Sequence, residues 1–175
     1  KNEPKTNTNS PVAKQQDFQG GFTLCGPIVK NKVFFFVSGE ITRKSFLLAN
    51  IPGSATSNIT LDEVNRIIAV LNRVAPSYDP GSYQDIISET NSNKILAKVN
   101  WNISNRHKLI LRHSYTYGEN IDNGRSPNSL RFYNNGVFFP STTNSTGLEL
   151  TSIFGNNKSN KLMLGYTKVL DDREP

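Results

Sequence analysis

Residues 94–117 alternate between two kinds of side chain with a period of two, and this pattern constrains the fold more than any other feature. Successive side chains of a β-strand point to opposite faces, so the pattern predicts two antiparallel strands around a polar turn at 104–107. The even positions carry most of the charged and amide side chains. The odd positions are Ile95, Ala97, Val99, Trp101 and Ile103, then Leu109, Leu111, His113, Tyr115 and Tyr117.

The aromatic residues of this strand pair lie at its two ends. Trp101 is close to the turn, whereas Tyr115 and Tyr117 are far from it. Transmembrane β-strands carry aromatic residues at both membrane surfaces, and a soluble sheet does not need them there. From Leu109 to Tyr117 the strand rises about 20 Å at a tilt of roughly 40°, near the ~25 Å apolar band of such barrels. These features favour a membrane barrel.

Residues 20–43 predict a second hairpin. Val33 to Val37 is an unbroken β-branched and aromatic run, and Lys30-Asn31-Lys32 is a polar turn before it. In the first strand, Phe22, Leu24 and Ile28 share one parity and are expected on one face.

The whole chain predicts six strands, at about 20–29, 33–43, 94–103, 107–117, 147–155 and 160–169. Short turns alternate with long connections at about 44–93 and 118–146, as in transmembrane barrels, where the long loops lie outside. The fold class expected is therefore all-β, an antiparallel transmembrane β-barrel segment. Residues 18–170 form the barrel part, 1–17 a polar lead-in, and 171–175 the start of the next loop.

A short amphipathic helix is expected in the first long connection, at about 61–74. Thr60 and Glu63 form a capping box, and Pro76 ends the pattern. Its apolar stripe either packs onto the rest of the loop or offers a docking surface for a partner. In the second long connection, Phe132, Tyr133 and 137–139 form an aromatic patch, which is either a loop core or part of a ligand surface.

Composition excludes several classes of protein. Hydrophobic residues make up 35% of the chain, which is low for a large core but ordinary for a wall that is apolar on one face. The single cysteine, Cys25, excludes an internal disulfide framework. The net charge is +6, yet no basic cluster forms a nucleic-acid motif. His107 and His113 do not suggest a metal site, no catalytic motif appears, and neither enzyme activity nor a cofactor is expected.

A family resemblance rests on three stretches in order. They are Leu24-Cys25-Gly26-Pro27-Ile28-Val29-Lys30-Asn31-Lys32-Val33-Phe34-Phe35-Phe36 with Glu40 and Arg43, then Tyr78-Asp79-Pro80-Gly81-Ser82, then 96–104 with 107–113. Together they resemble the barrel region of TonB-dependent outer-membrane transporters, of the Oar-like subgroup from Bacteroidetes-type bacteria. The chain departs from that pattern at Cys25, usually Gly, and at Gly39, usually aromatic.

The resemblance implies about six strands of a barrel of roughly 22, in the outer membrane of a Gram-negative bacterium. It also implies energy-coupled movement of a large or scarce solute, driven by the TonB energy-transducing complex acting on a plug. Lipid and lipopolysaccharide would be further partners. The chain begins at Lys1 without methionine, so it is expected to be a piece of a longer protein.

Candidate substrate-binding residues fall into two groups. Glu40, Lys98 and Arg112 have the parity of the lumen, where they either pair with the plug, line the solute path or simply solvate a wet interior. The outer loops carry the second group, because function concentrates on loops held by a rigid scaffold. These are Glu119, Asp122, Arg125, Arg131 and Tyr133.

Two other functions fit the same pattern. One is a structural or interaction component of an outer-membrane surface complex, with long loops that bind other proteins. The other is a soluble β-rich binding module, in which Ile95, Val99, Leu109 and Leu111 would pack against a second sheet.

Overall fold

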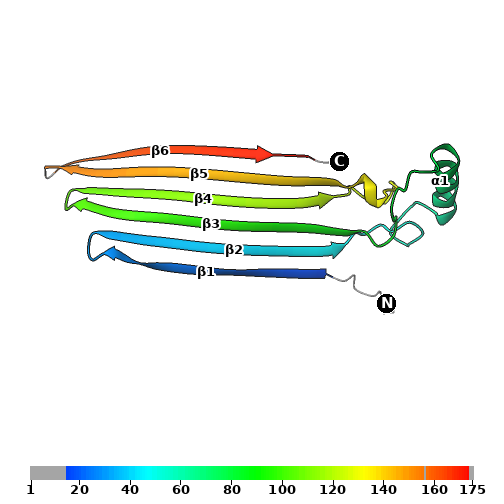
Figure 1. Cartoon of the computed structure of the whole chain (residues 1–175), viewed down its shortest axis with the longest axis horizontal. Coiled ribbons are helices and arrows are strands. Elements are labelled where there is room, and N and C mark those ends of the chain that lie inside the picture. The colour runs from blue at the N-terminus through cyan, green and yellow to red at the C-terminus, as the bar shows by residue number, and fades with distance from the viewer. Residues whose placement is uncertain (1–14, 156, 174–175) are drawn as a thin grey trace, which may run out of the picture.

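The computed structural model describes residues 15–155 and 157–173, so most of the predicted lead-in (1–14) lies outside the described residues. Six strands form one antiparallel sheet in the order β1-β2-β3-β4-β5-β6 (Figure 1). Their bounds are β1 Gln15–Val29, β2 Val33–Leu47, β3 Ile87–Ser104, β4 His107–Asp122, β5 Val137–Phe154 and β6 Lys158–Asp171. The three short turns lie at one end of the sheet, and the two long connections lie at the other (Figure 1).

The strands are longer than the sequence predicts, and the predicted loop bounds at 44–93 and 118–146 are wrong. The first connection is 48–86 and the second 123–136. Strand pairing continues through polar residues, from Lys44↔Thr90 to Asn120↔Phe139. The backbone ladder needs no apolar side chains, so a pattern of hydrophobicity detects only the half of each strand nearest the turns. For the same reason residues 15–17 and Asp171 belong to strands rather than to flanking loops.

Two irregularities in strand pairing change which residues face which side. The register shifts between Pro27 and Val29, and again between Asn102 and Ser104. A bulge inserts one unpaired residue, so the side chains beyond it change face. Val29 therefore lies opposite Val33, on the face of Phe22 and Leu24, although its parity in the sequence differs from theirs. Ile28 has no partner in this register, so its expected place on the same face stays a prediction.

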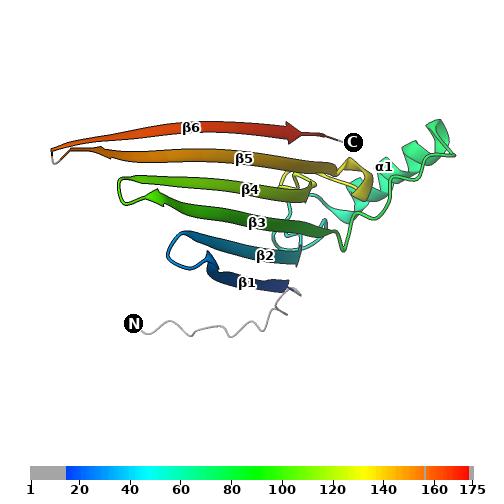
Figure 2. The same ribbon diagram turned by 60° about the vertical axis from the view of Figure 1, so that its left-hand side comes forward.

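The turn ends of the three hairpins are staggered. The β5–β6 turn projects farthest and the β1–β2 turn least (Figures 1 and 2). Backbone bonds join each turn region to the next hairpin, from the Asn102 amide to the Lys32 carbonyl at 2.8 Å and from the Ile153 amide to the Arg106 carbonyl at 2.8 Å. A progressive stagger of this kind accompanies the tilt of strands in a barrel wall.

One helix, α1 Leu61–Val74, stands beyond the loop end of the sheet (Figure 2). The Thr60 hydroxyl accepts the Glu63 amide at 3.3 Å, and the Glu63 carboxylate accepts the Thr60 amide at 2.8 Å, which completes the predicted capping box. Among the described residues, no helix is long and apolar enough to cross a lipid bilayer.

The two long connections fold together into what we call the outer module, residues 48–86 and 123–136. Its backbone bonds link Asn58 to Pro127 at 2.8 Å and Tyr133 to Ser82 at 2.8 Å. Phe132 is buried, and its ring meets Tyr83 edge to face with centroids 6.1 Å apart. The predicted aromatic patch is therefore divided, because Phe132 packs inside the outer module whereas residues 137–139 begin β5.

Candidate functional site

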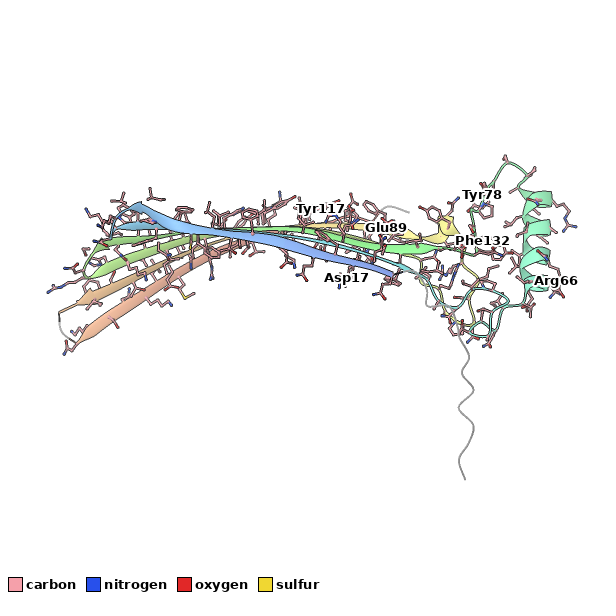
Figure 3. All side chains as sticks on the ribbon, turned by 90° about the horizontal axis from the view of Figure 1, so that it is seen from below. Asp17, Arg66, Tyr78, Glu89, Tyr117 and Phe132 are labelled. Atoms are coloured by element: carbon pink, nitrogen blue, oxygen red, sulfur yellow. The ribbon has the colours of Figure 1, made fainter. Side chains whose placement is uncertain are left out.

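One face of the sheet, the apolar face, carries hydrophobic side chains across all six strands. The register places these residues side by side: Phe22 and Leu24 of β1; Val33, Phe35 and Val37 of β2; Ile95, Val99 and Trp101 of β3; Leu109 and Leu111 of β4; Leu148 and Leu150 of β5; Leu162 and Leu164 of β6. Many remain solvent-exposed, including Leu24 at 59% and Leu164 at 60%. Seen edge-on, the sheet is a single layer with side chains on both faces (Figure 3).

Two histidines on the apolar face are hydrogen-bonded within the sheet. The His113 ring nitrogen lies 2.8 Å from the Thr146 hydroxyl, its cross-strand partner. His107 makes the same kind of contact with Ser152, at 2.9 Å. Both histidines thus have structural partners, and the described residues contain no cluster of three or more metal-ligating side chains. A polar group at membrane depth is tolerated when it is hydrogen-bonded in this way.

The opposite face, the polar face, holds most of the charged side chains of the strands. Figure 3 shows the division directly, with Asp17 and Tyr117 on opposite sides of the sheet. Lysine–carboxylate pairs bridge neighbouring strands: Lys44–Asp17 at 3.1 Å, Lys94–Glu40 at 2.7 Å and Lys161–Glu149 at 2.9 Å. Of the predicted lumen residues, Glu40 is therefore engaged by Lys94. Exposed ion pairs of this kind add little stability. They matter here because they occupy the nearby carboxylates and leave other cations without a partner.

Lys98 and Arg112 lie directly opposite each other on β3 and β4 of this face. The Lys98 ammonium lies 5.5 Å from the centre of the Phe36 ring, on the side away from Arg112. The Arg112 side chain lies over Gly147 of β5, on the side away from Lys98. A Cβ at Gly147 would come within 2.8 Å of Arg112 Nε. Among the described residues, neither cation has an ion pair.

A hollow of about 590 Å³ lies on the polar face one row of residues away from these two cations, which do not line it themselves. Hydroxyl side chains and glycines line much of it, and the Glu40–Lys94 pair closes one side. The row of residues beside Lys98 and Arg112 supplies its floor: Thr23, Ser38, Leu96 and Ser114. Small side chains over four strands leave room that larger residues would fill, and no local sequence pattern indicates this space.

The prediction that Glu119 lies in an outer loop is wrong, because this residue lies near the end of β4. It follows the parity of the apolar face and accepts bonds from the Asn91 amide group at 2.9 Å and the Tyr117 hydroxyl at 2.7 Å. Arg43 on β2 caps the same region through the Ser92 carbonyl at 2.9 Å and Asn93 Oδ1 at 2.7 Å. Glu119 is thus part of a polar network above the hydrophobic rows of the sheet. The side chain of Asp122 lies outside the described residues.

Arg125 joins the two halves of the outer module. Its guanidinium donates to the backbone carbonyls of Tyr83 at 2.6 Å and Gln84 at 3.2 Å. Burial lowers the pKa of this guanidinium below its usual value, although an arginine still remains protonated at neutral pH. With both terminal guanidinium nitrogens bonded to backbone carbonyls, Arg125 acts as a structural link between loops.

Arg131 and Tyr133 remain at the surface of the outer module, and Tyr133 is 55% exposed. A second hollow, of about 560 Å³, lies between α1 and residues 76–84, lined in part by Tyr78, Asp79 and Gln84. Figure 3 places Tyr78 and Phe132 between α1 and the end of the sheet. The sequence marks residues 78–82 as a motif stretch, but no local pattern shows that α1 faces them across this hollow.

Comparisons with known proteins agree with this geometry. A family model described as an outer membrane beta barrel domain matches residues 44–175, which is well over half of the chain. Neither a curated protein nor a solved structure matches the chain significantly. Antiparallel strands with one apolar and one polar face are what the wall of such a domain requires. The chain belongs to the outer membrane beta barrel domain family, which supports a location in the outer membrane of a Gram-negative bacterium.

Proposed function

We propose that the chain forms part of the wall of a TonB-dependent outer-membrane transporter, similar to the Oar-like subgroup, with about 22 strands in its complete barrel. The observation that carries the membrane part is the apolar face, which runs unbroken across six strands opposite a charged face. The three motif stretches at 24–43, 78–82 and 96–113 support the transporter part.

The open edges of the sheet support a larger barrel. Within the described residues, β1 and β6 each pair on one side only. Unpaired backbone groups are not tolerated in lipid, so further strands must pair with both edges in the membrane. The apolar face then meets lipid, the polar face meets the lumen, and the outer module lies outside the cell.

In this transporter the chain has no catalytic role. The TonB energy-transducing complex would act on a plug, and the chain would guide the solute along the polar face. The outer module would be the first surface that a solute meets, with Arg131 and Tyr133 exposed on it. Lipid and lipopolysaccharide would contact the apolar face and its polar upper margin.

Two measurements on the native full-length protein test the two parts separately. Membrane fractionation followed by gel electrophoresis before and after boiling should show an outer-membrane species that migrates differently when unheated. Titration with the purified periplasmic domain of TonB should then show binding. A soluble species without a mobility shift would contradict the barrel, whereas a heat-modifiable species that never binds TonB would contradict the transporter alone.

One observation favours a second function, as an interaction component of a surface complex. The helix α1 leaves Ile67 42% exposed, Val70 49% and Val74 73%, on the outermost element of the chain. Deleting α1 from the first connection together with the second connection (123–136) would then abolish complex formation without affecting solute uptake. The soluble alternative requires a second sheet against Ile95 and Leu111, and the described residues form a single sheet.

A further inference from the structure

The polar face has an excess of positive charge in one place. Asp17, Glu40 and Glu149 each form an ion pair, and in every case the partner is a lysine other than Lys98. Lys98 and Arg112 are left without a carboxylate among the described residues. Their row, Cys25-Phe36-Lys98-Arg112-Gly147-Gly165, contains no acidic side chain.

Lys98 and Arg112 are also cross-strand neighbours of like charge, an arrangement that destabilises an antiparallel pair. The two side chains respond by leaning apart. Lys98 turns toward Phe36 on β2, and Arg112 turns toward Gly147 on β5. The absence of a side chain at Gly147 is what admits Arg112, because a Cβ there would collide with it. The result is two neighbouring cations without a carboxylate partner among the described residues, a place that favours an anion.

The neighbouring hollow has the chemistry to hold the rest of an anionic molecule. Ser38 and Ser114 lie in the next row along the strands and present hydroxyl groups, which donate as well as accept hydrogen bonds. The volume of about 590 Å³ lies within the range of small-molecule sites.

We propose that Lys98 and Arg112 form a subsite for a carboxylate or phosphate group of the transported solute, and that the hollow beside them receives its hydroxylated remainder. An arginine presents two parallel N–H donors to such an anion, and a lysine adds a point charge. This inference rests on the proposed function, because it takes the polar face as the solute path. The same anion could instead be a carboxylate from another part of the protein inside the barrel.

Citrate binding to the native full-length protein in detergent tests the subsite, measured by calorimetry at low salt. Lys98→Met and Arg112→Met should each weaken citrate binding by at least about tenfold. Lys108→Met is the matched control, since Lys108 lies on the same strand and face as Arg112 and has no ion pair among the described residues. It faces Asn102 and Thr151 rather than another cation. It should change the affinity less than about twofold. Equal losses in all three variants, or none, would overturn the subsite.

Thermal unfolding distinguishes the two sources of the anion. If the subsite waits for a solute, Arg112→Met relieves repulsion, and the melting temperature rises or stays constant without citrate. If a carboxylate of the protein itself fills it, wild-type protein does not bind citrate and Arg112→Met lowers the melting temperature, which overturns the proposal. TonB binding without citrate binding would contradict the subsite but not the transporter. Citrate binding without TonB binding would contradict the transporter alone.

Discussion

The sheet and the outer module differ in whether their hydrophobic side chains are buried within the protein. The buried hydrophobic side chains of the described chain are Val64, Ile86 and Phe132, and all three lie in the outer module. The sheet buries no hydrophobic side chain of its own, and residues such as Phe22 stay 61% exposed. The outer module thus has a protein core, whereas the sheet has two bare surfaces.

This difference shows where each region obtains its stability. The outer module is held by packing around Val64 and Phe132 and by bonds between its two connections, such as Asn134 Nδ2 to the Asp79 carbonyl at 2.6 Å. The sheet is held by its backbone ladder, and its apolar face gains stability only when lipid replaces water. Substitutions on the sheet should therefore act through membrane insertion, and those in the outer module through local packing.

The largest effect is expected from Leu111→Arg. Leu111 lies in the middle rows of the apolar face, where a cation should cost about 2–4 kcal/mol. The free energy of unfolding in lipid vesicles, measured by urea titration, should fall by that amount. Ile110→Arg is the matched control, because the next residue faces the lumen opposite Glu149. Similar losses in both variants would mean that the two faces do not differ as described.

A smaller effect is expected inside the outer module from Val64→Ala. Val64 is fully buried, and removing two methyl groups should cost about 1.6 kcal/mol. Amide hydrogen exchange across 61–74 should speed up while exchange in the strands is unchanged. Val70→Ala serves as the control, because that side chain is 49% exposed on the same helix. Faster exchange in the strands would show that the two regions are coupled.

Loss of the helix cap should cost less again. Thr60→Ala removes the hydroxyl that accepts the Glu63 amide, at a cost of about 1 kcal/mol to the first turn of α1. Exchange of the amides at 61–64 should increase most. Thr60→Ser keeps the hydroxyl and should restore protection, and a serine variant as labile as the alanine variant would argue against the cap.

The smallest effect is a pH dependence of the same helix end. Hydrogen bonds from the Thr60 amide and hydroxyl lower the pKa of Glu63 below 4.5. A lowered pKa means that this contribution is complete above about pH 4.5 and disappears as the pH falls through the folded-state value. Protection at 61–64 should decline over that acidic range in the wild type. In Glu63→Gln it should not change there, and an identical decline would assign the effect to another group.

The sequence predicts the sheet better than it predicts the outer module. Six strands, three turns and the two faces follow from alternation, because each strand meets lipid on one side and water on the other. The shared face of Lys98 and Arg112 follows from parity. Their direct opposition depends on the register shift between Asn102 and Ser104, which the sequence pattern does not show, and the leaning of their side chains depends on Phe36 and Gly147 across further strands. The packing of Phe132 against Tyr83 joins residues 49 apart, and no local pattern encodes it.

The upper halves of the strands show a different limit. Residues such as Asn91 and Glu119 carry no periodic signal, yet they pair as regularly as the hydrophobic rows below them. Their ladder extends an existing hairpin, and extension is far less demanding than nucleation of a new pair. The alternation of hydrophobic and polar residues shows where a strand meets lipid. It does not detect the part of the same strand that continues into water.

The order of the strands has a consequence for assembly. Every strand pairs with its neighbours in sequence, so each hairpin can close from nearby residues before the next one arrives. Topologies made of such local contacts fold faster than those that join distant segments. Each completed hairpin also leaves one open edge, on which the following hairpin finds a ready template. The wall can therefore grow one hairpin at a time, each hairpin added to the edge of the one before it.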